Sequence, residues 1–136
     1  MPLVMSRVNR FDYESGYDYS WDATPGPDER DYAIYSVAED GVPVARALVN
    51  TKPLLLVGYT APPELLTTEL DYFEVHKSHR GRGVGGRVTQ ALTAAHGRLH
   101  ALSSPDAVGF YRSIGWSEYL HESGRSLSQA ELFVGP

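Results

Sequence analysis

The 136-residue sequence contains no cysteine, which excludes disulfide bonds, thiolate zinc sites and cysteine nucleophiles. It also lacks any apolar run near the roughly 20 residues that a membrane-spanning helix needs. No secretory signal is indicated at the start, because the polar residues Asn9, Arg10 and Asp12 follow at once. We therefore expect a soluble, cytoplasmic protein with no membrane partner.

Positive charge is also scarce: the chain has 12 Lys and Arg residues and 17 Asp and Glu residues, for a net charge of -5. This balance argues against a nucleic-acid partner, since phosphate contacts need a broad basic surface. The charges are segregated, because residues 12–31 hold seven acids and one base, whereas residues 75–105 hold bases and no acid. The segregation is either chance on a solvated surface or one pole for an anion and another for a cation.

Apolar residues make up 42% of the chain, as is typical of a globular protein, and the length favours one domain over residues 1–136. The hydrophobic pattern predicts an α+β fold in which strands outnumber helices. One helix is expected from Gly83 or Val84 to Gly97, and a second after Ser104 that ends at Gly115. The expected strands are residues 3–8, 32–37, 42–49, 54–59, 67–76, 99–102, 116–121 and 130–134.

A glycine-rich turn, Arg-Gly-Arg-Gly-Val-Gly-Gly at residues 80–86, follows an expected strand and opens the first helix. Glycines allow the backbone to curl tightly and to approach a ligand closely. The free N–H groups at a helix start then point at an anion. Arg80 and Arg82 add positive charge at the same place, so the turn indicates a phosphate or pyrophosphate site.

Three other interpretations of this turn compete with that one. Gly81, Gly83 and Gly86 fit the G-x-G-x-x-G fingerprint of dinucleotide-binding folds, but the next expected strand ends in serines where that fingerprint needs an acid. A nucleoside-triphosphate P-loop needs G-K-[ST], and residues 86–88 read Gly-Arg-Val. A turn without any ligand stays open as the third interpretation.

Two segments together resemble the GNAT acyltransferases. Residues 75–85, V-x-x-x-x-R-G-R-G-V-G, resemble the R/Q-x-x-G-x-G/A segment that cradles the coenzyme A pyrophosphate in that family. Residues 107–116, A-V-G-F-Y-R-S-I-G-W, resemble the family's A-x-x-F/L-Y-x-x-x-G-F/W helix. The close match covers residues 69–118, and the strands on either side of it agree with the family's sheet.

The resemblance implies the GNAT fold, a mixed, mostly antiparallel sheet flanked by few helices. Its N-terminal helical layer should be reduced, because residues 12–30 are too short for the two helices that usually follow the first strand. The resemblance further implies an acyl-CoA N-acyltransferase that moves an acetyl group from acetyl-CoA to an amine of a small molecule by direct attack in a ternary complex. Acetyl-CoA is the co-substrate and no metal is required. The implied coenzyme A-binding residues are Val75, Arg80, Gly81, Arg82, Gly83, Val84, Gly85 and Gly86.

The catalytic residues implied by the resemblance are Tyr111, Glu69 and Asp71. Tyr111 occupies the position of the family's tyrosine near the coenzyme A sulfur and would protonate the leaving thiolate. Glu69 and Asp71 are two apart on one strand, so they share a face and are candidate bases. Glu74 is closer to the thioester in sequence and has the opposite parity unless a bulge intervenes.

Several points stay open at this level. His76 with His79, or His96 with His100, lacks a third ligand at suitable spacing, so we expect exposed histidines and no metal site. The acidic, aromatic residues 12–31 would face a cationic acceptor or merely cover the core. Peptide or protein N-acetylation is the alternative acceptor class, a coenzyme A-binding pseudoenzyme or sensor is the alternative function, and a homodimer is open.

Overall fold

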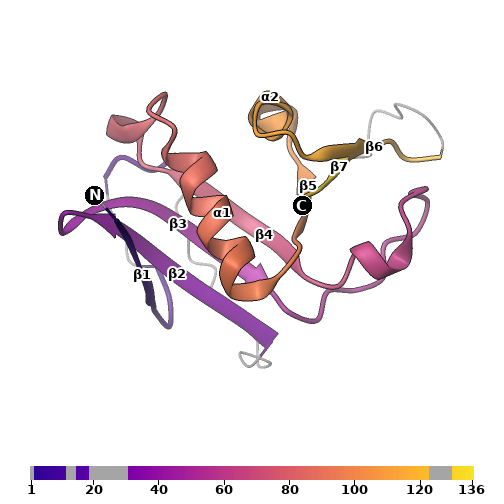
Figure 1. The fold of residues 1–136 in the computed structure, drawn as a ribbon, viewed down its shortest axis with the longest axis horizontal. Helices are drawn as coiled ribbons and strands as arrows, with labels where there is room; N and C mark the ends of the chain where they lie inside the picture. Colours follow the sequence, from indigo (N-terminus) through magenta and orange to yellow (C-terminus); the bar gives the residue numbers. More distant parts are fainter. Residues whose placement is uncertain (1, 12–14, 19–30, 123–129) are drawn as a thin grey trace.

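The structure is a computed structural model that describes residues 2–11, 15–18, 31–122 and 130–136. A seven-stranded sheet has the order β1-β2-β3-β4-β5-β7-β6, with the helices α1 and α2 on one face (Figure 1). The strands are β1 (Leu3–Arg7), β2 (Tyr32–Glu39), β3 (Val42–Asn50), β4 (Glu69–Val75), β5 (His100–Ser103), β6 (Ser117–Tyr119) and β7 (Glu131–Val134). The helices are α1 (Val84–His96) and α2 (Val108–Ser113), with short 3-10 turns at Pro63–Leu65, Lys77–His79 and Pro105–Ala107.

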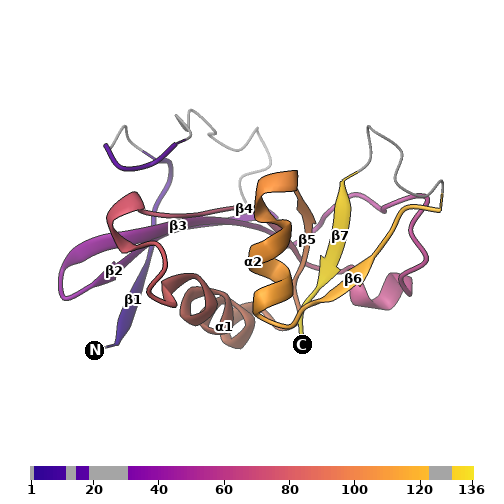
Figure 2. The same cartoon turned by 90° about the horizontal axis from the view of Figure 1, so that it is seen from above.

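Neighbouring strands run antiparallel throughout the sheet except for β4 and β5, which are parallel. Parallel strands need a crossover connection, and α1 provides it between β4 and β5. Seen from above, both helices lie on the same side of the sheet (Figure 2). The expected α+β fold with a mixed, mostly antiparallel sheet is confirmed.

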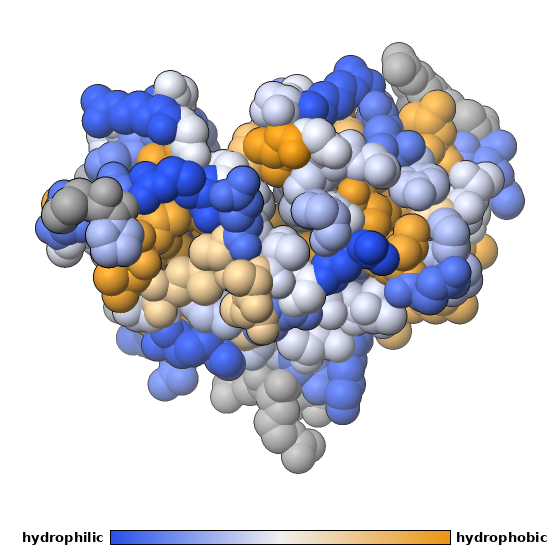
Figure 3. Space-filling view, in the orientation of Figure 1, coloured by the Kyte–Doolittle hydropathy of each residue, from blue (hydrophilic) through white to orange (hydrophobic). Residues whose placement is uncertain are grey.

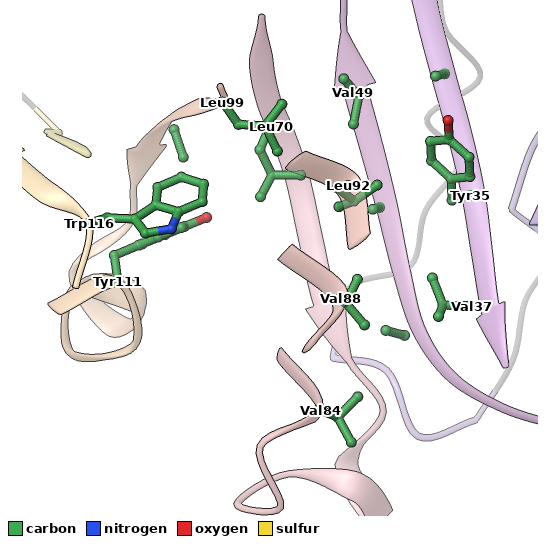
Figure 4. Close-up of a cluster of buried hydrophobic side chains, with 14 of the residues drawn as sticks. Tyr35, Val37, Val49, Leu70, Val84, Val88, Leu92, Leu99, Tyr111 and Trp116 are labelled. Carbon is green, nitrogen blue, oxygen red and sulfur yellow. The ribbon is translucent and has the colours of Figure 1, made fainter. Parts of the chain in front are cut away.

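Helix α1 forms where the sequence predicts it. It begins after Gly83, whose φ of 76° lies in the left-handed region, and ends before Gly97 with φ of 82°. Both conformations suit glycine because a Cβ atom would be strained there. One face of the helix, Val84, Val88 and Leu92, is buried against the sheet (Figure 4).

The second helix differs from the expected one at its start. Ser104 precedes it but makes no side-chain capping bond, and residues Pro105–Ala107 form a 3-10 turn before α2. The helix ends at Ser113, two residues before the expected Gly115, whose φ of 80° turns the chain toward β6. Tyr111 and Trp116 from this segment pack into the same core as α1 (Figure 4).

The strand expected at residues 54–59 is wrong. Only Tyr59 makes a β-bridge there, to His121. Leu54 and Val57 are 89% and 80% exposed, so the run is not a buried strand despite its apolar sequence. Gly58, with a φ of 92°, turns the chain at the end of the run.

Candidate active site

Strands β4 and β5 pair at Glu69 and His100. At the far end of β4, the N–H of His76 donates to the Val44 carbonyl of β3 at 2.8 Å. Because successive residues of a strand point their backbone groups to opposite edges, the N–H groups of Val75 and Phe73 point away from β3, toward the β5 side. The Val75 carbonyl on that edge accepts a bond from the Arg80 side chain, at 3.0 Å from Nε.

A cavity of about 600 Å³ opens beside this edge of β4. In the space-filling view the molecule is hollowed between the turn that precedes α1 and the helix α2 (Figure 3). Its lining comes from three places: β4, the glycine-rich turn, and the segment from the end of β5 through α2. The lining includes these implied coenzyme A-binding and catalytic residues: Val75, Arg80, Gly81, Gly83, Val84, Gly85, Gly86 and Tyr111.

The glycine-rich turn presents backbone donors to this cavity. Gly81 and Gly83 have φ of 75° and 76°, which a residue with a side chain rarely adopts. Arg87 is the first residue of the helix whose N–H bonds back to the turn, to the Gly83 carbonyl at 3.3 Å. The N–H groups before it lie at the positive end of the helix dipole, an arrangement that favours an anion.

Gly85 serves helix packing as well. A Cβ atom built on Gly85 would lie 2.6 Å from Cε1 of Phe110 on α2, so a side chain there would push the two helices apart. At Gly86 the nearest atom, Cγ2 of Ile114, would be 3.5 Å away, an ordinary contact. Gly86 is therefore the glycine of the first helical turn that tolerates substitution.

Arg80 is held by groups of the protein. Beyond Val75, its guanidinium donates to Asp18 at 2.9 Å and to Glu74 at 3.0 Å. Arg82, the second arginine expected at the anion site, is exposed and is absent from the described lining of the cavity. The backbone of the turn, more than these two guanidinium groups, thus forms the candidate anion site.

Glu74 anchors the chain around this arginine. It is only 6% exposed and accepts bonds from the Tyr72 hydroxyl at 2.6 Å and from the backbone N–H of Asp18 at 2.7 Å, besides Arg80. With its oxygens engaged in this way, Glu74 is placed as a structural carboxylate, and it is a poor candidate for a base.

Asp18 lies in the acidic segment, residues 12–31, but contacts residues of the basic segment, residues 75–105. Its carboxylate lies 2.9 Å from the Lys77 ammonium and 2.9 Å from Arg80, and it lines the cavity. The bonds from Lys77 and Arg80 hold the pKa of Asp18 below its usual range. Most of residues 12–31, where a cationic acceptor was expected to bind, lie outside the described residues.

A bulge in β4 changes which side chains share a face. Leu48 of β3 is opposite Tyr72 and Val49 is opposite Leu70, so Asp71 is an extra residue. Leu70 consequently packs in the core under the helices, whereas Tyr72 packs on the other face against the cluster around Phe11. The bulge that the sequence analysis left open is therefore present, and it removes the opposite parity of Glu69 and Glu74.

Glu69 and Asp71 nonetheless interact. Burial, followed by the neighbouring charge of Asp71 and a hydrogen bond with it, raises the pKa of Glu69 to about 7. A carboxylate with that pKa takes up a proton readily at neutral pH, as a general base must. Both residues lie near the start of β4 and neither is among the residues that line the cavity, which begins at Phe73.

Tyr111 reaches the cavity from α2. Its ring is stacked on Phe133, with centroids 5.2 Å apart, and tilted against Trp116 at 5.1 Å. Burial raises the pKa of the Tyr111 phenol, so the hydroxyl stays protonated over the neutral range. The side chain is only 6% exposed and therefore has a fixed position at the cavity wall.

The histidines are less exposed than expected. His100 is completely buried, and His96 lies 2.7 Å through Nε2 from the Tyr35 hydroxyl. His76 accepts the backbone N–H of Ser78 through Nδ1 and contacts the Ser15 carbonyl through Nε2. Across the described parts of the chain, no three His, Asp or Glu side chains gather as a metal site would require.

Sequence reasoning did not single out Phe73, and it gave Asp18 and His100 other roles, in the acidic pole and in a candidate histidine pair. Phe73 lines the cavity because the bulge turns it toward the helices, which no periodicity reveals. Asp18 and His100 are brought in by contacts with residues distant in the chain, so local patterns carry no signal for them. No described helix is long and apolar enough to cross a membrane.

Comparisons with solved structures agree with this fold. A putative N-acetyltransferase of Escherichia coli, YhhK, solved bound to coenzyme A, has a TM-score of 0.62 at 15% identity over 99% of this chain and 100% of that one. An acetyltransferase of Thermus thermophilus has a TM-score of 0.54 at 18% identity over 78% of this chain. The enzyme AAC(6')-Ib, solved with ribostamycin and coenzyme A, has a TM-score of 0.54 at 16% identity over 76% of this chain.

This chain spans 64% of the length of the Thermus thermophilus protein and 63% of AAC(6')-Ib, and at these identities the likeness concerns the fold. No curated protein sequence matches the chain. The family model for the acetyltransferase (GNAT) domain matches residues 31–118, which is more than half of the chain. The chain therefore belongs to the GNAT acetyltransferase family.

Proposed function

We propose that this protein is an N-acetyltransferase that moves an acetyl group from acetyl-CoA to the amine of a small molecule. The observation that carries the proposal is a single cavity bounded by the glycine-rich turn, the open edge of β4 and Tyr111. Glu69, with its pKa of about 7, lies on the same strand. The cavity thus combines an anion site, backbone N–H donors and the phenol of Tyr111. The candidate base, Glu69, lies farther along β4.

Coenzyme A fits these residues. Its pyrophosphate is an anion, and the N–H groups at the start of α1 point at the place where an anion is favoured. Its pantetheine arm is an extended chain with amides, which suits the backbone groups of Phe73 and Val75 on the open edge of β4. Solved neighbours such as YhhK and AAC(6')-Ib carry coenzyme A, which supports the same ligand for this chain.

Acetyl-CoA supplies the thioester, and the protein supplies the groups that make its carbonyl reactive toward an amine. The N–H groups of Phe73 and Val75 are the candidate donors for the oxyanion, since both face the cavity edge of the strand. In this proposal Glu69 accepts a proton from the ammonium, directly or through water, because the free amine alone is nucleophilic. As the C–N bond forms and the C–S bond breaks, Tyr111 donates a proton to the departing thiolate.

The acceptor is proposed to be a small-molecule amine that approaches the face of the sheet opposite the helices. Glu69 and Tyr72 face that side, away from α1. The ribostamycin complex of AAC(6')-Ib shows that a neighbour in fold binds a small amine-bearing molecule. The acidic charge of this chain, -5 overall, favours a cationic acceptor by Coulomb attraction.

The test of the cofactor site compares Gly86→Asp with Gly86→Asn. Both side chains have the same shape and room, since only Ile114 lies at ordinary contact distance, but only the aspartate adds negative charge at the anion site. We expect Gly86→Asp to weaken coenzyme A binding by about tenfold or more beyond Gly86→Asn, a difference of about 1.4 kcal/mol. Isothermal titration measures both affinities, and equal affinities would contradict the pyrophosphate site.

A coenzyme A-binding protein without catalysis is the alternative function. The two are separated by release of free thiol from acetyl-CoA in the presence of a panel of amines, with hydrolysis in the absence of amine as the baseline. Amine-dependent thiol release supports the enzyme. Tight binding of acetyl-CoA with no release for any cationic, neutral or peptide amine would support the sensor.

A further inference from the structure

Among the residues that the structure describes, His100 is the most completely buried titratable side chain outside the cavity. It lies on β5 opposite Val134 of β7, and its exposed fraction is 0%. Its backbone N–H donates to the Thr68 carbonyl at 3.0 Å, so the main chain is satisfied. Neither ring nitrogen, however, has a hydrogen-bond partner among the residues that the structure describes.

An imidazole ring buried without hydrogen bonds makes the folded state less stable. A buried polar atom without a partner loses its hydrogen bonds to water with nothing in return, and the great majority of buried polar side-chain atoms are hydrogen-bonded. A phenylalanine would fill a similar volume without that penalty. The ring nitrogens of His100 therefore lack hydrogen bonds in the side-chain positions of this structure, and a small movement of a neighbouring polar group could provide one.

Glu69 is that partner. The parallel pairing of β4 and β5 sets Glu69 directly opposite His100, and Nε2 of the ring lies 3.8 Å from the Glu69 Oε2 atom. This separation is too long for a hydrogen bond, which needs about 3 Å, but a shift of about 1 Å closes it. Hydrogen bonds of catalytic groups often tighten in this way once substrate is bound.

We infer that His100 is a positioning residue whose neutral ring, protonated on Nε2, donates to Glu69 and holds its ionised carboxylate ready to accept a proton. The inference rests on the proposed role of Glu69 as base. A neutral imidazole has one N–H, and a carboxylate only accepts, so Nε2 must carry the hydrogen for the pair to bond.

The surroundings agree with this protonation state. Burial lowers the pKa of His100, so the ring is neutral at pH 7 and adds no positive charge next to Glu69. The charged and titratable groups placed at Glu69 by the described residues are Asp71 on β4 and His100 on β5, while its β3 partner, Asn50, is neutral. Burial and then Asp71 raise the pKa of Glu69, and a donor at Nε2 opposes both effects.

The first test needs no variant. Nitrogen-15 NMR of histidine-labelled protein distinguishes the two neutral tautomers by the shifts of their ring nitrogens. We expect His100 to be neutral at about pH 9, above the pKa of Glu69, with the hydrogen on Nε2. A hydrogen on Nδ1, or a charged ring, would overturn the inference.

The second test follows the Glu69 carboxyl by carbon-13 NMR through a pH titration, with Glu69→Gln used to assign its signal. In His100→Phe the ionised carboxylate loses its donor, so we expect the titration midpoint to rise by about one pH unit, the equivalent of a tenfold change in the equilibrium. In His100→Gln the amide N–H replaces the donor, and the midpoint should stay near that of the wild type. An unchanged or lowered midpoint in His100→Phe, or an equal rise in both variants, would overturn the inference.

The pH dependence of kcat/KM tests whether the contact between His100 and Glu69 matters for the reaction. The acidic limb of the kcat/KM profile should move to higher pH in His100→Phe and return in His100→Gln, whereas a merely structural loss would lower the profile without moving it. If Glu69→Gln leaves the limb in place, the proposed base is wrong, and the NMR midpoints still decide the contact between His100 and Glu69. Should His100→Phe fail to fold, the tautomer measurement on the intact protein remains decisive.

Discussion

The two ends of β4 are built differently, although only a few residues separate them. Around Val75 the site consists of backbone: amides of the strand edge, and amides and glycines of the turn that follows. Around Glu69 it consists of side chains, whose properties come from Asp71 and from His100 on another strand. In the proposed function, the first end binds the pyrophosphate and pantetheine of coenzyme A, and the second sets the proton affinity of the base.

This difference has a physical reason. Backbone donors at a helix start have their positions set by local geometry and bind an anion with little dependence on side chains. The proton affinity of Glu69, in contrast, depends on burial and on every neighbouring charge. Changes at the Glu69 end should therefore affect turnover and its pH dependence, whereas changes at the Val75 end should affect cofactor affinity.

The largest expected effect comes from Glu69→Gln. Removal of the base should lower kcat by about 10²–10⁴-fold, the usual contribution of general base catalysis, while coenzyme A affinity stays unchanged. Glu64→Gln, which removes an exposed carboxylate of the Pro63–Leu65 turn, is the control with the same change of charge. Steady-state kinetics and calorimetry measure the two quantities, and a parallel loss of affinity would show that the two ends do not act separately.

A smaller effect is expected from Tyr111→Phe. Its phenol is the proposed acid for the thiolate, so kcat should fall by about 10²-fold with little change in coenzyme A binding. The stacking on Phe133 and the contact with Trp116 persist because the ring is kept, and the melting temperature checks this. Because burial raises the pKa of Tyr111, the loss should be the same from about pH 6 to about pH 9. Full turnover in the variant would mean that Tyr111 only packs the core and that solvent protonates the thiolate.

The smallest effect concerns the arginine that joins the turn to β4. Arg80→Ala removes a donor from buried Glu74 and from the Val75 carbonyl, and we expect a loss of about 1–3 kcal/mol in the free energy of unfolding. Lys77→Ala breaks only the exposed ion pair with Asp18 and should cost under about 1 kcal/mol. Arg82→Ala, which also removes one positive charge, is the control for net charge. Urea denaturation compares the three, and equal losses in all of them would mean that Glu74 does not depend on Arg80.

The sequence was sufficient for the glycine-rich turn and the helix that follows β4. Glycines at residues 81, 83 and 97 mark backbone conformations that only glycine adopts easily, and helix α1 begins and ends where they indicate. The same glycines, with the motif around Tyr111, identify the family that the comparison with residues 31–118 establishes. Backbone conformations of this kind depend on the residue and its chain neighbours, so the turn and the helix bounds were predictable from the sequence.

The Glu69 end of β4 was predictable only in its residue types. Glu69 and Asp71 were recognised as candidate carboxylates, but the bulge at Asp71 arises from the pairing of β4 with β3 and inverts the expected faces. The exposed apolar run at residues 54–59 was mistaken for a strand for a related reason, because strand formation depends on the partner available for pairing.

The sequence by itself determined the order of most elements, the two helices, the glycine-rich turn and the family, because each depends on neighbours in the chain. Tertiary structure alone decided that Arg80 joins Asp18 and Glu74, and that His100 lies buried against Glu69. These contacts join residues 6 to 62 positions apart. Glu74 and His100 are buried in them, which removes water from around their polar atoms, whereas Arg80 and Asp18 stay partly exposed. Burial is a property of the packed chain, and no single segment of the sequence carries it.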